Sequence, residues 1–302
     1  MKIAITGSSG MIGSALCLRL GAAGHEIVRI RNGDPSDAGA QWNPEAGWLR
    51  EGVLDGVDAV LHLGGTSIDG GRWGAGHKES IRKSRIEGAR LLVEAIRAMP
   101  EAERPKTFVT SSAVGFYGER GDERLTEASA RGSGFLADVC AAWEAEALKA
   151  ESLGLRVVAV RSGVVLRSLL PVVLTPFKLG LGGPLGSGKQ YFAWVALDDV
   201  VRIYERVLVD DALSGVVLSG VVNGVAPQEQ TNSEFTKALG AALHRPTVMP
   251  LPGFALKLIM GGEKASETAL ISQRVVPQAL LDAGFEFTHP KIDSAIEAAL
   301  AS

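Results

Sequence analysis

Apolar residues along the first half of the chain follow two alternating patterns. Short apolar runs rich in β-branched residues occupy residues 2–6, 26–30, 57–63, 105–110 and 155–160. Between several of these runs, apolar residues recur at helical intervals, up to Gly24 after the first run and then over residues 77–98 and 135–152. Buried strands that alternate with helices are typical of a parallel sheet with right-handed crossovers. We therefore predict an α/β fold built on such a sheet.

The pattern becomes less regular in the second half. A Gly/Pro-rich loop occupies residues 180–188, followed by a short strand near 191–195 and a helix that opens at Asp198-Asp199. We predict a sheet domain over residues 1–165, whose sheet later segments can complete. A smaller α+β lobe over residues 166–302 is expected to cover the carboxyl ends of the strands.

Composition narrows the class of protein. The chain has 302 residues, of which 46% are hydrophobic, so it can bury a large core. Its net charge is −3 with mixed signs and no basic block, so we expect neither nucleic acid nor an anionic membrane as a partner. Cys17 and Cys140 each lie in a helical pattern, which predicts buried free thiols in a reducing compartment. We find no signal-peptide pattern and no apolar run long enough to span a bilayer, and expect a cytoplasmic protein.

A glycine-rich turn directly follows the first apolar run. Gly7, Gly10 and Gly13 are spaced G-x-x-G-x-x-G between a strand and a helix. Glycines there permit a tight turn, the approach of a pyrophosphate to the backbone, and close packing of the helix, whose free N–H groups face the phosphates. The predicted dinucleotide-binding residues of this turn are Gly7, Ser9, Gly10, Met11, Ile12 and Gly13. The alternative is a glycine-rich turn that binds nothing.

The end of the second apolar run distinguishes two cofactors. An NAD site places a carboxylate there for the ribose 2′-hydroxyl, whereas an NADP site places a cation for the 2′-phosphate. This run ends in Arg31-Asn32 without an acid, and Asp34 comes later, within a loop. Strand alternation puts Arg29 on the same face as Arg31. We therefore favour NADP(H) over NAD(H), with a solvated charge at Arg31 as the alternative.

Two further features bear on ligands. The strand at residues 57–63 ends in Gly64-Gly65, a glycine pair that suits close approach of a ligand at the carboxyl edge of a sheet. His62, at the end of that buried strand, is expected to be a hydrogen-bonded core histidine. We predict no metal site, because no histidine has ligand spacing with cysteines or acids among His25, His62, His77, His244 and His289.

Many ordered segments resemble the extended short-chain dehydrogenase/reductase superfamily, and within it an epimerase family of nucleoside-diphosphate-sugar type. The resemblance includes Thr6-Gly7-Ser8-Ser9-Gly10-Met11-Ile12-Gly13, His62-Leu63-Gly64-Gly65, Arg72-Trp73, Ser111-Ser112-Ala113-Val114-Gly115-Phe116-Tyr117-Gly118, Trp143-Glu144, Arg161-Ser162-Gly163 and Asn223-Gly224. It implies a Rossmann-type, doubly wound parallel sheet with a small C-terminal α+β substrate lobe.

The resemblance also implies roles for particular residues. Leu63 and Gly64 would line the adenosine side of the cofactor, and Arg31 with Asn32 would meet its 2′-phosphate. The remaining implied cofactor contacts are Glu79 and Arg85, facing the cofactor cleft, and Val164, near the nicotinamide. The alternative for Glu79 and Arg85 is a solvated helix face, and Arg161 is expected to be either a ligand contact or a buried, paired structural cation.

The catalytic residues depart from the superfamily. Its chemistry uses a tyrosine as acid/base with a lysine four residues later, and a serine that polarises the reacting oxygen. Ser112 could supply the serine, or it could merely cap a turn. The helix that should carry Y-x-x-x-K has Phe135 and Val139 at those positions.

Two interpretations remain open. In the first, another residue carries the proton, and the candidates are Tyr117, which we place first, Asp138 and Lys78. Tyr117 could equally be an aromatic residue packed on a loop. In the second, the chain binds the cofactor without turnover, as a regulatory or sensor protein.

The loop at residues 180–188 leads into candidate substrate contacts. Lys189 and Gln190 offer donors to an anionic group and Trp194 offers a stacking face, although a surface loop with a solvated lysine is as plausible. Family members have a glycine-rich turn after Leu166, whereas this chain continues Arg167-Ser168-Leu169, so the loop is either short or incomplete.

We expect NADP(H)-dependent epimerisation or oxidoreduction at a hydroxyl-bearing carbon of a small molecule. The resemblance suggests a nucleotide-linked sugar as substrate, and fold alone does not fix that function. A homodimer through the two long helices is a further expectation.

Overall fold

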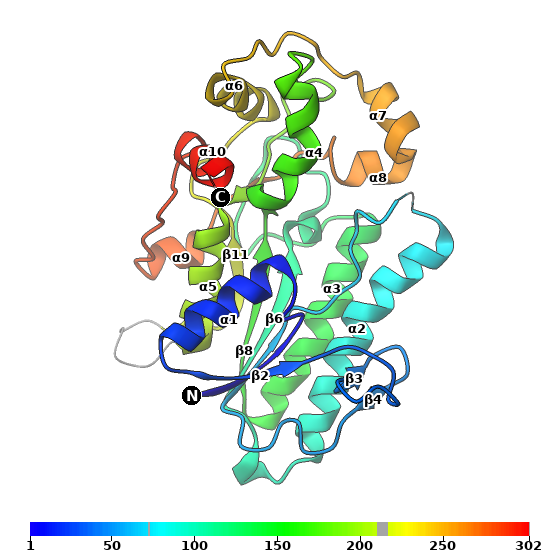
Figure 1. Ribbon diagram of the computed structural model, residues 1–302, viewed down its shortest axis with the longest axis vertical. Helices are drawn as coiled ribbons and strands as arrows, with labels where there is room; N and C mark the ends of the chain where they lie inside the picture. Colours follow the sequence, from blue (N-terminus) through cyan, green and yellow to red (C-terminus); the bar gives the residue numbers. More distant parts are fainter. Residues whose placement is uncertain (72, 210–216, 302) are drawn as a thin grey trace.

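The computed structural model describes residues 1–71, 73–209 and 217–301, and its centre is a six-stranded sheet. Arg72, part of the resemblance above, lies outside the described residues. The strand order is β11-β8-β6-β5-β1-β2, and every neighbouring pair is parallel. The strands are β1 (Lys2–Thr6), β2 (Glu26–Ile30), β5 (Ala59–His62), β6 (Thr107–Ala113), β8 (Arg156–Ser162) and β11 (Gly220–Gly224) (Figure 1). The predicted parallel, Rossmann-type sheet is confirmed.

Helices cover both faces of this sheet. On one face, α1 (Met11–Ala22) and α5 (Leu197–Val209) share an apolar cluster with β1, β6 and β8, and Cys17 lies within it. On the other face, α2 (Ala75–Ala98) and α3 (Phe135–Leu148) pack around Phe108. Both cysteines are free and buried, as predicted.

The chain reverses its direction of travel across the sheet between β1 and β5. From β1 it goes outward to β2, then returns to β5 on the other side and continues to β11. Open α/β sheets bind ligands at the carboxyl ends of the strands beside such a reversal. Helix α5 and strand β11 come from beyond residue 165, and β11 is the last strand on one side of the sheet.

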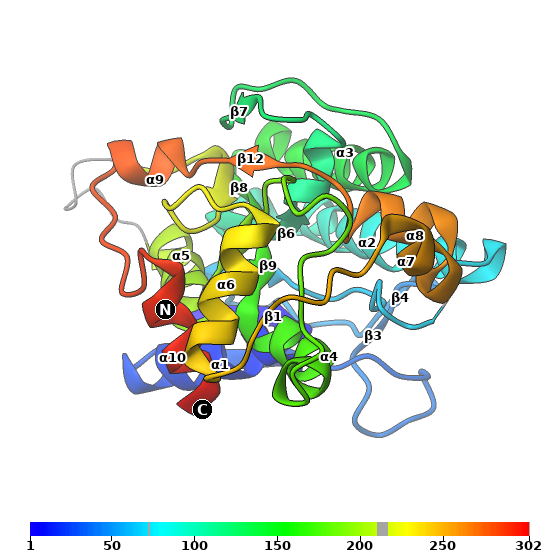
Figure 2. The same ribbon diagram turned by 90° about the horizontal axis from the view of Figure 1, so that it is seen from above.

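The remaining segments gather at the carboxyl ends of the strands. Seen from above, α4, α6 and α10 lie together over one part of the sheet, and α7 and α8 lie near α2 and α3 (Figure 2). An apolar cluster built on Leu170, Phe235 and Ile296 joins the first group. The helices that follow β8, apart from α5, are α4 (Leu166–Lys178), α6 (Asn232–Ala242), α7 (Gly253–Met260), α8 (Gly262–Glu267), α9 (Gln278–Asp282) and α10 (Ile292–Ala301).

Several short elements connect these parts. Paired two-residue strands are β3 (Trp42–Asn43) with β4 (Trp48–Leu49), β7 (Arg124–Leu125) with β12 (Arg274–Val275), and β9 (Val164–Val165) with β10 (Trp194–Val195). The 3-10 helices are η1 (Glu101–Glu103), η2 (Val114–Tyr117) and η3 (Lys149–Leu153). Within the described ranges, no helix combines the length and apolarity needed to cross a bilayer.

The segment after β9 is a helix, so no glycine-rich turn follows Leu166 in this chain. Helix α4 begins at Leu166 and contains Pro171 and Pro176, residues that disfavour a helix interior. Leu166, Leu170 and Phe177 lie on its buried face and pack in the lobe cluster. Tertiary packing of that face therefore stabilises a helix that local propensity argues against.

Two glycines of α1 make a matched test of the turn. A Cβ on Gly13 would lie 2.2 Å from the Gly7 carbonyl oxygen, whereas a Cβ on Gly21 would meet nothing within 4 Å. We expect Gly13→Ala to lower the free energy of unfolding by about 2 kcal/mol or more, because backbone cannot yield as a flexible side chain does. Gly21→Ala should raise it by about 0.5–1 kcal/mol through helix propensity. Urea denaturation of both variants measures this, and equal effects would contradict the close packing.

Candidate functional site

The glycine turn places the start of α1 at the carboxyl edge of the sheet. Gly7 adopts φ +66°, a left-handed conformation that favours glycine, and its oxygen accepts the Gly10 N–H at 3.0 Å. Helix α1 starts at Met11 after Gly10, with no side-chain cap and no acid in its first turn. Its positive end and free N–H groups are therefore available to an anion such as a pyrophosphate.

Two arginines lie in or directly after β2, the strand that pairs with β1. Arg29 donates from Nη1 to the Ser8 carbonyl oxygen at 3.4 Å, and Arg31 follows the strand's last residue; both are exposed. The backbone of Arg31 is fixed by bonds with Gln41 and Trp42, and Asn32 forms a bridge with Trp42. Among the described residues, no carboxylate forms an ion pair with Arg31, so its charge is available to a ligand.

The end of β5 forms the wall opposite these arginines. The Gly64 N–H donates to Thr6 Oγ1 at 3.1 Å, and the same hydroxyl is 2.8 Å from His62 Nδ1. The Trp42 ring lies directly over the place that a Cβ on Gly64 would occupy, at 2.9 Å. Burial lowers the pKa of His62 to about 4, so this side chain is a neutral core residue, as predicted.

The residues implied on α2 differ in their surroundings. Arg85 packs against Gly65, donates from Nη1 to the Thr66 and Ile81 carbonyl oxygens at 2.9 and 3.2 Å, and lies 5.4 Å from the Trp143 ring centroid. Burial lowers its pKa. Glu79 instead pairs with Arg82 and Lys83 on its own helix, with its side chain 46% exposed, the arrangement of a solvated helix face.

Val164 completes the edge on the other side. It is 37% exposed at the start of β9, and its N–H donates to the Ala193 carbonyl oxygen at 2.9 Å. The glycine turn, the end of β2, the end of β5 and Val164 therefore all belong to the carboxyl edge of the sheet, where the resemblance places a dinucleotide.

A buried ion pair lies beneath this edge. Arg161 of β8 donates from Nε and Nη2 to the two carboxylate oxygens of Glu144 on α3, at 2.8 and 2.7 Å, and both side chains are no more than 6% exposed. Burial alone lowers the pKa of Arg161, but the hydrogen bonds and charge of Glu144 raise it above its ordinary value. Arg161 is thus a structural cation, one of the two roles considered for it.

Ser112 and Tyr117 belong to the same network. Ser112 donates to Glu144 at 2.5 Å and is 3% exposed. The Tyr117 hydroxyl receives a bond from Arg161 at 3.0 Å, lies 2.7 Å from Asn223 Oδ1, and is fully buried. Burial raises the pKa of Tyr117. Both hydroxyls are thus buried and bonded within the network, and the catalytic roles of Ser112 and Tyr117 stay predictions.

The start of α3 is occupied by the C-terminal lobe. The Glu267 carboxylate accepts the N–H groups of Phe135 and Leu136, both at 2.8 Å. The Lys78 ammonium lies 4.5 Å from the Phe135 ring centroid and pairs with Glu263 at 2.6 Å. Val139, where the superfamily has its lysine, is buried. Asp138, which was also a candidate for carrying the proton, is 66% exposed and pairs with Arg131.

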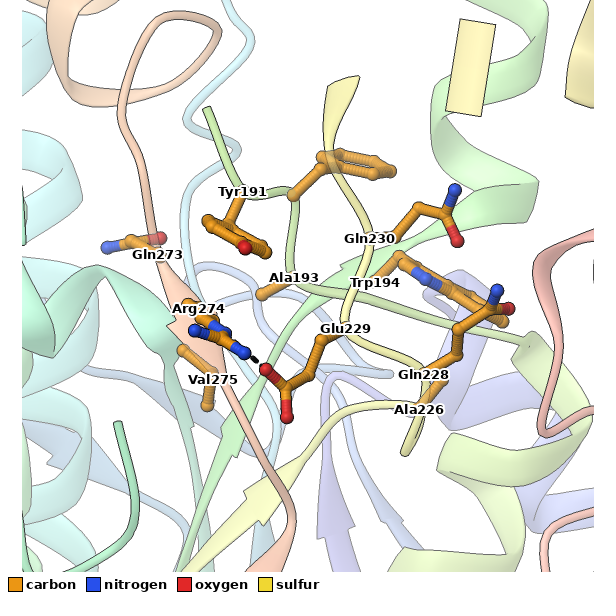
Figure 3. Close-up of a pocket in the computed structure, with 11 residues that line it drawn as sticks. Tyr191, Ala193, Trp194, Ala226, Gln228, Glu229, Gln230, Gln273, Arg274 and Val275 are labelled. Atoms are coloured by element: carbon orange, nitrogen blue, oxygen red, sulfur yellow. Dashed lines mark hydrogen bonds and ion pairs between the residues drawn. The ribbon is translucent and has the colours of Figure 1, made fainter. Parts of the chain in front are cut away.

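The predicted substrate loop is mostly structural. Gln190 is buried and donates to the Leu185 and Ala269 carbonyl oxygens, and Trp194 is 1% exposed, whereas Lys189 is exposed. Of the three residues, the structure leaves only Lys189 open to a ligand at the surface. Figure 3 shows that Trp194 instead lines a small pocket, together with Tyr191, Phe192, Ala193, Ala226, Gln228, Glu229, Gln230, Gln273, Arg274 and Val275.

Glu144 and Asn223 belong to the buried network around Arg161 without a role predicted from the sequence. Glu144 carried a signal, because it lies four residues after buried Cys140 and three before buried Ala147, on the apolar side of a helix. An acid in that position predicts a buried partner. Asn223 carried no such signal, because its partner Tyr117 is 106 residues away in the chain.

Comparison with known families identifies the chain. The model of the NAD dependent epimerase/dehydratase family matches residues 3–217. The chain belongs to this family. A second model, described only as a domain of unknown function (DUF1731), matches residues 251–299, which include α7, α8, α9 and part of α10.

Relatives within the epimerase family extend over the whole chain. An epimerase family protein of Mycobacterium bovis is 42% identical over 298 residues, covering 97% of this chain and 96% of its own length. The crystal structure of human epimerase family protein SDR39U1 (isoform 2) with NADPH is 31% identical with a TM-score of 0.86, covering 100% of this chain and 99% of that one. The nucleoside-diphosphate sugar epimerase from Corynebacterium glutamicum is 35% identical with a TM-score of 0.78, covering 99% of this chain and 58% of that one.

The buried network of this epimerase family member generates a stability prediction. Glu144→Gln removes the counter-ion of a buried arginine and should lower the free energy of unfolding by about 3–5 kcal/mol. Ser112→Ala and Tyr117→Phe each remove a hydroxyl and should cost about 1–3 kcal/mol. The control is Glu146→Gln on the same helix, whose partner Lys149 is exposed, with a change within about 0.5 kcal/mol. Urea denaturation decides, and similar losses for both glutamates would contradict the network.

Because of His62, we expect the free energy of unfolding to depend on pH. The ordinary pKa of 6.5 falls to about 4 in the folded chain, so between these values the unfolded chain binds a proton that the folded chain does not. The contribution of neutral His62 to the free energy of unfolding is therefore fully present above about pH 6.5. About 3 kcal/mol of it is lost as the pH drops to about 4. Urea denaturation across this range should show a smaller slope for His62→Gln, whereas substitution of exposed His244 by Asn should retain it. Equal slopes for all three proteins would contradict this assignment.

Proposed function

We propose that the protein binds NADP(H) along the carboxyl edge of its sheet. The observation that supports this most directly is the uncapped start of α1 behind the glycine turn, flanked by Arg29 and by Arg31, which has no carboxylate partner among the described residues. The N–H groups would receive the pyrophosphate, and Arg31 with Asn32 the 2′-phosphate. The human relative crystallised with NADPH supports the same choice of cofactor.

The remaining predicted contacts complete this proposed site. Gly7, Ser9, Gly10, Met11, Ile12 and Gly13 would contact the diphosphate, Leu63, Gly64 and Gly65 the adenosine side, and Val164 the nicotinamide. Arg85 would stabilise the wall at Gly65 through its bond to Thr66. Glu79 has the weakest support, because its charge is already paired along α2.

The reaction that this site supports best is oxidoreduction or epimerisation at a hydroxyl-bearing carbon. NADP(H), when bound, supplies or accepts the hydride. A proton must also reach or leave the substrate oxygen, and Lys78 is the group that we assign to it. Its ammonium lies beside Phe135, the position of the superfamily tyrosine, with its side chain 27% exposed. The name of the relative from Corynebacterium glutamicum supports a nucleotide-linked sugar as substrate class.

A non-catalytic binding role is the second candidate. The observation that favours it is the loss of the superfamily acid/base pair, with Phe135 and Val139 in place of tyrosine and lysine and with Ser112 bonded to Glu144. In this role the chain would respond to the NADP(H) level without turnover.

Fluorescence titration with NADPH and NADH tests the cofactor. We expect the chain to bind NADPH at least about tenfold more tightly than NADH, because a charge-assisted bond to the 2′-phosphate contributes about 1.5–3 kcal/mol. Arg31→Ala should remove this preference, whereas Arg97→Ala at the exposed end of α2 should retain it. Equal affinities in the unmodified protein would exclude the assigned role of Arg31, and no binding would overturn the site.

The same samples separate the two candidate functions. Incubation with NADP⁺ and UDP-glucose, followed by chromatography of the sugar nucleotides, detects an epimer or an oxidised product. Conversion that is lost in Lys78→Met, with NADPH affinity retained, supports the enzyme. NADPH binding without conversion favours the binding role.

A further inference from the structure

The acidic and basic residues are unevenly divided between two parts of the chain. Residues 164–197 and 235–262 contain six Lys or Arg and no Asp or Glu. The whole chain has 31 basic and 34 acidic residues, so the rest carries 25 against 34. A net charge of −3 therefore combines +6 in these two segments with −9 elsewhere.

The structure brings these two segments together. The Arg245 Nε donates to the Lys178 carbonyl oxygen at 2.9 Å, and the Met249 N–H donates to that of Gly182 at 3.3 Å. Figure 1 shows α4, α6 and α7, with the connection between α6 and α7, at one end of the molecule. The positive charges are thus collected at that end.

Large apolar side chains are exposed on the same segments. They include six that are each between 53% and 73% exposed, a range that leaves most of the side chain in water: Leu179, Leu181, Val248, Met249, Phe254 and Ile259. Around them, Lys178, Arg245 and Lys257 are exposed. We call these nine residues the cap surface. Contiguous exposed apolar groups on a soluble domain mark an interaction site.

The positive charge of the cap surface favours some binding partners over others. In a two-fold dimer the same surface meets itself, which would bring like charges together. An anionic partner instead gains from every lysine and arginine. A bilayer interface accepts protruding apolar side chains flanked by lysines without a matching rigid shape, since the lysine stems lie along the apolar layer while their ammonium groups reach the headgroups.

We propose that the cap surface is a docking site for an anionic lipid bilayer. The apolar side chains enter the boundary between headgroups and acyl chains, and the basic residues contact lipid phosphates. The chain attaches peripherally. This proposal replaces the expectation, drawn from net charge, that an anionic membrane is no partner, and it is independent of the proposed cofactor.

Co-sedimentation of the full chain with vesicles tests the proposal. We expect binding to vesicles of equimolar phosphatidylglycerol and phosphatidylcholine at low ionic strength, at least about tenfold above binding to phosphatidylcholine alone. Added salt should weaken it, because exposed charges are screened. Equal binding to both vesicles, or none, would overturn the proposal.

Two double variants and two controls identify the surface. Phe254→Ser with Ile259→Ser, and Lys178→Glu with Lys257→Glu, should each reduce vesicle binding at least about tenfold. Leu18→Ser on α1 and Lys106→Glu are also exposed substitutions but lie away from the cap surface, and should retain binding. Near-ultraviolet circular dichroism verifies the fold of each variant. Equal losses in the controls, or a dimer that Phe254→Ser dissociates in a chain that binds no vesicles, would refute the assignment.

Discussion

The buried pair between Glu144 and Arg161 fixes the relative positions of the elements beneath the candidate site. It joins α3 to β8, and through Ser112, Tyr117 and Asn223 it extends to β6, η2 and β11. A buried charge without a partner is far more destabilising than a complete pair. These segments therefore keep their register together or lose the network together, which makes the edge of the sheet a rigid platform.

The same network explains why the two ends of the candidate cleft differ. At the glycine turn, N–H groups and arginines remain available to an anion. At the end of β6 and in η2, a serine and a tyrosine that resemble catalytic groups are instead bonded to Glu144 and Arg161. Polar groups that complete a buried network cannot also serve a substrate without leaving a charge unsatisfied. The proposed cofactor site and the proposed proton-transfer group thus use different residues, and Lys78 is the partly exposed cation beside Phe135.

The sequence predicted those features that depend on local periodicity. The strands, the long helices, the glycine turn and the neutral core His62 all follow from residues close in the chain. The partners of the side chains at the strand end do not follow from such local patterns. Adjacent Ser111 and Ser112 face opposite sides of the sheet, and their hydroxyls meet Tyr204 and Glu144 respectively. Their partners lie 93 and 32 residues away, beyond any local pattern. Helix α4 likewise depends on distant contacts, since packing in the lobe stabilises a helix despite its two prolines.

Net charge averages over the whole chain, so it does not report the local charge of segments that the fold brings together. The acid-free segments lie on both sides of α5 and β11 in the chain, so that neither forms a basic block of its own. Folding places them together at the carboxyl ends of the strands, the edge at which the proposed cofactor site opens (Figure 1). A bilayer docked on the cap surface would therefore lie next to the proposed cofactor site. The residues outside the two acid-free segments carry a net negative charge, which the same bilayer would repel. This repulsion would orient the chain with the cap surface toward the lipid.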